Sequence, residues 1–325
     1  MATTYNKPAL TVEKQVELLE GRGLRVGDRQ YALRSLSRIG YYRLSGYWHI
    51  WKQPEDRFAA DASFERAVWL YEYDRRLRLI AMDGIERVEI LYRTVIAYTL
   101  AHAYGAFAHV DRSNFSDEKG DHARWLGKLN EEIGRSNEVF LEHYRKAYVG
   151  FPKVPIWMAI EVMSLGALSK LFMMMHKHDQ ALAVQHWRIS PEVARRWLHT
   201  ISYVRNVCAH HSRLWNREIS IKPMIPRHRP EWRELNGGRV YAVLCILREL
   251  TAGAEGADHW ADSVREHLAA MEPHRALLGA MGVPPDWLSS PFWSEDPATL
   301  APPGDGPGRA NPSSAPANQA KVQAG

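Results

Sequence analysis

The segment from Phe64 to Tyr104 constrains the fold of this chain more than any other. Apart from Gly84, it contains almost no residue that breaks a helix. Apolar residues recur through it at helical spacing, and they are Val68, Leu70, Leu77, Ile80, Ile85, Val88, Leu91, Val95 and Leu100. The pattern predicts one long helix, or two helices that meet near Asp83 and Gly84.

The polar side of this predicted helix is rich in charge. Several of the charged residues are three or four positions apart, which permits ion pairs along a helix. The pattern is typical of a charged, solvated face. Its members are Asp74, Arg75, Arg76, Arg78, Glu86, Arg87, Glu89 and Arg93.

Helical spacing also marks shorter segments on either side. Thr11 is a suitable cap for a helix over Leu10–Gly23, a second helix begins at Asp28, and the aromatic run Tyr41–Trp48 follows. No segment shows the alternation typical of strands, so we predict an all-α fold with a small helical N-terminal module. Further helices are predicted over 121–134, 137–148 and 156–175, from Ser190 onward, and over 239–250 and 259–271.

Composition indicates the environment in which the protein folds. The most apolar segment, residues 156–175, contains Glu161 and Lys170, so we interpret it as a buried core helix and expect no membrane contact. Cys208 and Cys245 are the only cysteines, which favours a cytoplasmic, reducing environment. Residues 296–325 are largely proline, glycine, alanine and serine, and we expect this tail to be disordered.

The residues best suited to chemistry lie in the stretch Tyr203–Arg217. It combines three arginines, two histidines and two asparagines. The whole chain has 42 lysines and arginines against 37 acidic residues, a net charge of +5 that is compatible with nucleic-acid binding. This stretch is therefore the candidate active site.

Helical geometry divides the candidates within that stretch. Asn206 and His210 are four residues apart, so the amide can hydrogen-bond the imidazole and fix its tautomer. Arg205 lies five residues before His210, which is about 140 degrees beyond a full turn, so these two do not share a narrow face. A second copy of the motif across a homodimer interface would complete an enclosed site.

Metal-independent RNA cleavage needs a base, an acid and positive charge on the phosphate. Histidine transfers protons near neutral pH, and arginine pairs with phosphate oxygens in a fixed fork. The chain contains no Walker-type glycine loop, nucleophile elbow or His-Glu-x-x-His helix. We expect no cofactor and no metal, since a zinc site among His199, His210 and His211 lacks further ligands at familiar spacing.

Neighbouring polar residues each have two interpretations. His211 either supports the site or is structural. Arg213 and Arg217 either contact the RNA backbone or pair with Glu86 or Glu89 on the long helix.

Residues further from the motif are similarly open. Asp74 and Glu86 either hold Arg205 or His210 in place or form structural ion pairs. The aromatic residues at Tyr41, Tyr42 and Trp48 could stack on bases, but core packing is the commoner role, and we favour it.

Arg205–His210 resembles the Arg-x4-His motif of the HEPN superfamily. With the residues up to Arg217, it resembles the Abi family of bacterial abortive-infection proteins, in particular the AbiD and AbiF group. The similarity spans roughly residues 7 to 220. Other stretches agree with that family's pattern in order, namely Lys7–Leu10 with Gln15, Tyr41–Ser45, Tyr73–Arg78, Ile85–Glu89, Pro155–Trp157 and Gly166–Lys170.

The resemblance implies an HEPN-like helical bundle acting as a metal-independent endoribonuclease in phage defence, usually as a homodimer. The products would be a 2′,3′-cyclic phosphate and a 5′-hydroxyl. Arg205 would stabilise the scissile phosphate, His210 would transfer protons, and Asn206 is the polar residue after the arginine. RNA is the implied substrate, and a regulatory non-coding RNA is a further partner found with some relatives.

We predict four parts in the chain. They are an N-terminal helical module at 1–55, the HEPN-like domain at 56–225, a C-terminal helical extension at 226–295 and the tail at 296–325. An alternative function is a non-catalytic RNA- or nucleotide-binding module that acts as an antitoxin or scaffold. Binding alone would need the arginines but would depend less on His210.

Overall fold

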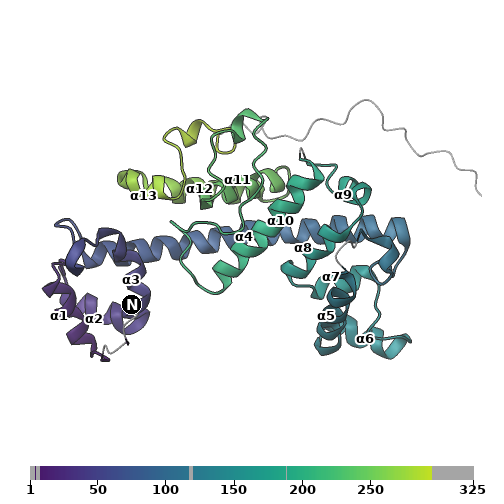
Figure 1. The fold of residues 1–325 in the computed structure, drawn as a ribbon, viewed down its shortest axis with the longest axis horizontal. Coiled ribbons are helices and arrows are strands. Elements are labelled where there is room, and N and C mark those ends of the chain that lie inside the picture. The colour runs from purple at the N-terminus through teal and green to yellow at the C-terminus, as the bar shows by residue number, and fades with distance from the viewer. Residues whose placement is uncertain (1–3, 5–7, 117–119, 188, 295–325) are drawn as a thin grey trace, which may run out of the picture.

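A computed structural model describes residues 4, 8–116, 120–187 and 189–294, and these residues form an all-α fold (Figure 1). Isolated bridges between single residues are the only β pairing among them. The helices are α1 (Val12–Gly21), α2 (Arg29–Ile39), α3 (Tyr41–Trp48), α4 (Phe64–Tyr104), α5 (His122–Arg135), α6 (Val139–Ala147), α7 (Ile156–Val162), α8 (Leu165–Met174), α9 (Lys177–Ala183), α10 (Pro191–Ala209), α11 (Val240–Thr251), α12 (Ala257–Ala269) and α13 (Arg275–Ala280).

The long segment forms a single helix, α4, which is the axis of the molecule. It contains 41 residues and begins at Ser63, whose hydroxyl accepts a hydrogen bond from the Arg66 N–H at 3.2 Å. Helix α3 packs near its first turns, α10, α11 and α12 pack along it, and α7, α8 and α9 pack toward its end (Figure 1). Of the two possibilities in the sequence, one continuous helix is the correct one.

Gly84 remains within α4 because a tryptophan occupies the space beside it. The Trp260 indole of α12 is fully buried, and its N–H donates to the Ile80 carbonyl at 2.8 Å. A Cβ atom on Gly84 would lie 2.6 Å from that indole. The glycine thus permits close packing of α12 on α4 and does not break the helix.

The prediction of one core helix over residues 156–175 is wrong, because the segment divides into α7 and α8. Ser164 caps α8 by accepting a hydrogen bond from the Ala167 N–H at 3.2 Å. Arg93 of α4 donates to the carbonyls at the end of α7, those of Ile160 and Met163. The arginine thereby supplies donors to carbonyls that a helix end leaves unpaired.

Arg93 is held by Glu89, one turn earlier on α4. Both side chains are largely buried, with 14% and 19% of their surfaces exposed. A solvated face was expected here. The pair instead joins α4 to the α7–α8 break, and a buried, hydrogen-bonded pair of this kind is costly to disrupt.

The N-terminal helices α1, α2 and α3 enclose a smaller hydrophobic cluster together with the first turns of α4. Thr11 caps α1, as predicted, and Asp28, where the second helix was predicted to begin, caps α2. Trp48 is fully buried, which confirms its interpretation as core. Tyr42 departs from that interpretation because 92% of its surface is exposed.

The other predicted helices correspond to α5, α6, α10, α11 and α12, whereas α9 and α13 were not predicted. The tail at 296–325 lies outside the described residues. Among the described helices, none has both the length and the apolar composition needed to cross a bilayer.

The contact between Gly84 and Trp260 gives a stability test. We expect Gly84→Ala to lower the free energy of unfolding by about 1–3 kcal/mol, the usual cost of overpacking a close-packed contact. The measurement is chemical denaturation followed by circular dichroism. Gly127→Ala on α5 is the matched control, since a Cβ there meets nothing within 4 Å. Equal or greater stability of Gly84→Ala would contradict this packing.

Candidate functional site

Helix α10 carries the candidate motif at its C-terminal end. Ser190 begins the helix as predicted, accepting a hydrogen bond from the Val193 N–H at 3.3 Å. Its apolar stripe is buried against the core, through Val193, Trp197, Ile201, Val204 and Cys208. This stripe fixes the rotation of α10 and therefore which motif residues face outward.

The helix ends within the motif itself. His210 is the C-terminal cap residue, and its N–H donates to the Asn206 carbonyl at 3.0 Å. His211 has a φ of 54°, in the left-handed region that a residue with a bulky side chain seldom adopts. The chain turns away from the helix axis at this point, so His210 and His211 leave the helix in different directions.

The structure places Asn206 and His210 on the exposed surface of α10, and Arg205 is half-buried. The Asn206 amide oxygen lies 3.4 Å from an Arg205 guanidinium nitrogen, within the range of a long hydrogen bond. In the described part of the chain, the predicted bond between Asn206 and the His210 imidazole is not formed. The three residues are nonetheless neighbours at the end of one helix.

Arg205 lines a surface depression of about 440 Å³ between α10 and α4. Glu86 lines the same depression, so the structure brings these two predicted residues together. Asp83 and Glu89 also line it, but Asp83 pairs with Arg87 at 3.0 Å and Glu89 pairs with Arg93. Glu86 is therefore the carboxylate in this depression that is best able to position Arg205.

Of the two interpretations of Asp74, the structural one describes its contacts, because it pairs with Arg78 and holds backbone rather than Arg205 or His210. Its fully buried carboxylate accepts from the N–H groups of Leu214 at 3.0 Å and Trp215 at 2.7 Å. It also accepts from the Tyr47 hydroxyl at 2.6 Å and from Arg78. One side chain thus joins α3, α4 and the segment that follows the motif.

The electrostatics of Asp74 reflect this burial. Removal from water raises the pKa of the Asp74 carboxyl, against the opposing effects of the Tyr47 hydrogen bond and the Arg78 charge. An ionised carboxylate is purely an acceptor, and it matches the donors that surround these two oxygens. The carboxylate is therefore tied to its four partners, and it cannot be replaced by an apolar group without leaving donors unpaired.

The remaining motif residues attach the segment after α10 to the N-terminal module. Arg213 donates to the Gly46 carbonyl of α3, and Arg43 of α3 donates to the His211 carbonyl at 2.8 Å. Arg217 donates to the Arg213 carbonyl at 2.7 Å. The described structure thus uses Arg213 and Arg217 in backbone contacts, and neither pairs with Glu86 or Glu89.

Two other chemical possibilities can be judged from the geometry. Burial raises the pKa of the Cys208 thiol to about 12, which makes it a poor nucleophile at neutral pH. Within the described ranges, no group of three or more histidine, cysteine, aspartate or glutamate side chains is arranged to hold a metal ion. His199, His210 and His211 therefore do not form such a group.

Sequence reasoning did not identify Arg43, Gly46 and Tyr47 as supports of the motif. All three belong to α3, more than 150 positions before the motif segment. Arg43 and Gly46 contact that segment directly, and Tyr47 is connected to it through Asp74. The aromatic run that contains them was interpreted as core. The available signal was the agreement of Tyr41–Ser45 with the Abi family's pattern, which includes Arg43 but neither Gly46 nor Tyr47.

Comparison with known protein families decides the relationship. A family model described as Abi-like protein matches residues 34–216, which is more than half of the chain. This chain belongs to the Abi-like protein family. The matched region begins in α2 and ends at Asn216, so it contains α3, α4, Asp74 and the whole motif through Trp215. No curated protein and no solved structure matched the chain.

Membership in the Abi-like family supports a role in abortive infection. The matched region holds both partners of the Asp74 contact, the carboxylate itself and the backbone of Leu214 and Trp215. The extension formed by α11, α12 and α13 lies beyond it.

The Asp74 contacts give a second stability test. Asp74→Ala leaves the buried Arg78 without its carboxylate, with only the Tyr47 hydroxyl at 3.5 Å as an acceptor, and we expect the unfolding free energy to fall by about 3–5 kcal/mol. Asp74→Asn should cost less, because the amide oxygen still accepts from backbone. Urea denaturation measures both. Asp83→Ala is the matched control on the same helix, because its ion pair is exposed and should contribute less than about 1 kcal/mol. Equal losses for Asp74→Ala and Asp83→Ala would contradict the assignment.

Proposed function

We propose that this Abi-like protein is a metal-independent endoribonuclease that acts in phage defence by abortive infection. The observation that carries the proposal is the placement of Arg205, Asn206 and His210 at the accessible end of α10. A polymeric substrate can reach this surface directly. Buried contacts on either side of the motif, from α10 and from Asp74, support a fixed geometry for these residues.

In this proposal, His210 transfers the protons and Arg205 binds the phosphate. The 2′-oxygen loses its proton and attacks the adjacent phosphorus, the bond to the 5′-oxygen breaks, and that oxygen gains a proton. The products are a 2′,3′-cyclic phosphate and a 5′-hydroxyl. Arginine suits the pentacoordinate phosphate because its donors pair with two oxygens at once.

A homodimer forms part of the proposal, because the reaction needs both a base and an acid. One chain supplies His210 as the exposed histidine of the Arg-x4-His motif, and a second copy would supply another. The surface around Arg205 supports such pairing. Leu79 lines the same depression, and Ile90 lies three turns further along α4, with 58% and 55% of their surfaces exposed.

The alternative is a non-catalytic RNA- or nucleotide-binding module that acts as an antitoxin or scaffold. One observation favours it. In the part of the chain that the structure describes, the His210 imidazole makes no side-chain hydrogen bond, whereas a catalytic imidazole usually has a partner that orients it. A second protomer or bound RNA would supply that partner under the leading proposal. A regulatory non-coding RNA is compatible with either function.

The proposal predicts loss of RNA cleavage in Arg205→Ala and His210→Ala. General acid or base groups contribute about 10²–10⁴ in rate, so His210→Ala should lower kcat by at least about 100-fold. The measurement is single-turnover cleavage of RNA in excess chelator. A substrate with 2′-deoxyribose at the cleaved position should resist, because it lacks the nucleophile.

His143→Ala is the matched control, since His143 is an exposed histidine on α6, outside the motif. It should cleave at the wild-type rate. Cleavage that stops in chelator, or that continues in His210→Ala, would contradict the proposed mechanism. Tight RNA binding without cleavage by any form would favour the alternative.

A further inference from the structure

The exposed face of α10 continues from the motif toward the start of the helix. Asn206, His199 and Arg196 lie on this face with His210, at separations of three, four or seven residues that keep side chains on one side of a helix. From His210 to Arg196 the helix rises by about 21 Å. The motif is therefore one end of a longer polar surface.

Positive charge gathers at the far end of this surface. The pKa of the exposed His199 is lowered by partial desolvation and by the charges of Arg196 and Lys170. Lys170 belongs to α8, which packs directly against α10. The three side chains therefore lie close to one another although they come from two helices.

Lys170 also lines a cavity of about 350 Å³ between α5 and α8, together with Arg124 and Lys128. A second cavity of about 640 Å³ is lined by Lys177 and Arg195. Met173 and Met174 line both cavities, so the two are adjacent.

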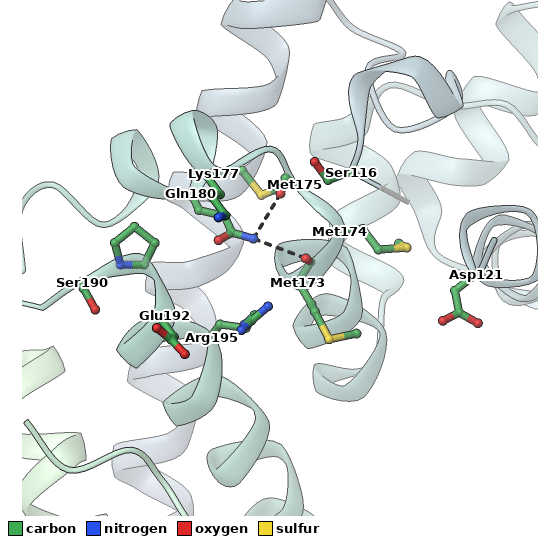
Figure 2. A pocket seen from close by; sticks show the side chains of 11 residues that line it. Ser116, Asp121, Met173, Met174, Met175, Lys177, Gln180, Ser190, Glu192 and Arg195 are labelled. Atoms are coloured by element: carbon green, nitrogen blue, oxygen red, sulfur yellow. Dashed lines mark hydrogen bonds between the residues drawn. The ribbon is translucent and has the colours of Figure 1, made fainter. Parts of the chain in front are cut away.

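Figure 2 shows the larger cavity, with Arg195 of α10 on one side and Met173 of α8 facing it. Gln180 forms part of its wall, and the amide donates to the Met173 and Met175 carbonyls at 3.3 and 3.1 Å. These bonds tie α9 to the end of α8, so the wall of the cavity is braced by buried contacts.

We define the basic hollow as the surface formed by these two cavities and the adjoining Arg196. Its cations are Arg124, Lys128, Lys170, Lys177, Arg195 and Arg196. Its carboxylates are fewer, namely Asp121, Glu132 and Glu192.

The basic hollow has six cations and three carboxylates, so it carries an excess of positive charge. Arg124 pairs with Asp121 at 3.3 Å. Across the described ranges, Lys128, Lys170, Arg195 and Arg196 form no ion pair with any carboxylate. A polyanion would neutralise these charges without first breaking an internal contact.

We propose that the basic hollow and the exposed face of α10 bind the phosphate backbone of single-stranded RNA on one side of the cleavage point. This inference rests on the proposed function, since it makes the motif the reacting end of the bound strand. The cations would contact phosphates, and Met173, 44% exposed, offers an apolar surface to unstacked bases.

The test measures RNA affinity in the His210→Ala background, so that binding is read without cleavage. The probe is a fluorescently labelled, unstructured 12-nucleotide RNA, followed by anisotropy across a range of salt concentrations. Adding Lys170→Ala and Arg196→Ala should raise Kd about tenfold. The slope of the logarithm of the binding constant against the logarithm of the salt concentration should become shallower by about 1.4, because two phosphate contacts to a single strand are lost.

Lys14→Ala with Arg34→Ala is the control pair, because both are exposed cations on α1 and α2 of the N-terminal module. It should leave Kd unchanged. An unchanged Kd in the Lys170/Arg196 variant, no binding of the RNA, or tighter binding of a duplex of the same length would each overturn the inference.

Kinetics separate this inference from the proposed function. In the otherwise wild-type protein, Lys170→Ala with Arg196→Ala should raise KM and leave kcat near its normal value, because the altered residues are far from the reacting phosphate. If the protein binds RNA through these residues but never cleaves it, the endoribonuclease proposal is contradicted and the RNA-binding surface is supported. If the Lys170/Arg196 variant cleaves RNA with an unaltered KM, the endoribonuclease proposal is supported and the RNA-binding surface is contradicted.

Discussion

The buried carboxylate of Asp74 is the interaction on which the arrangement of this molecule depends. It accepts hydrogen bonds from a tyrosine of α3, an arginine of α4 and two backbone N–H groups of the segment after α10. A buried charge of this kind is tolerated only when nearby donors satisfy it. The N-terminal module, the central helix and the motif segment must therefore assemble together. Arg43 and Arg213 add direct bonds across the same junction.

One kind of interaction recurs elsewhere in the fold, in which a long side chain donates a hydrogen bond to a backbone carbonyl of another element. Arg93 does so at the end of α7. Tryptophan indoles do so elsewhere, with Trp125 donating to Ala167, Trp187 to Leu250, Trp197 to Met224 and Trp260 to Ile80. Each indole buries a large apolar surface and also fixes a distance between two elements. These four tryptophans thus hold pairs of elements together as well as filling the core.

Local sequence was sufficient for most of the helices and insufficient for the contacts between them. Thr11 caps α1 as predicted, and the helices predicted from Asp28 and Ser190 begin there with those residues as caps, because a cap depends only on its next few residues. The break between α7 and α8 was missed, since the arginine that stabilises it lies about 70 positions earlier. The candidate site shows the same difference between what local sequence predicts and what long-range contacts decide. Helical spacing placed Asn206 and His210 on one face, whereas the use of Asp74 depends on a contact over 140 positions.

Under the proposed function, the motif would act only while Asp74 holds the segment that follows it. Amide hydrogen exchange in Asp74→Asn, measured alongside the RNA cleavage rate of the same protein, tests that claim most directly. The account predicts faster exchange at Leu214 and Trp215, unaltered exchange in α5 and α6, and a fall in kcat with little change in KM. Fast exchange at those two amides with cleavage at the full wild-type rate would contradict it.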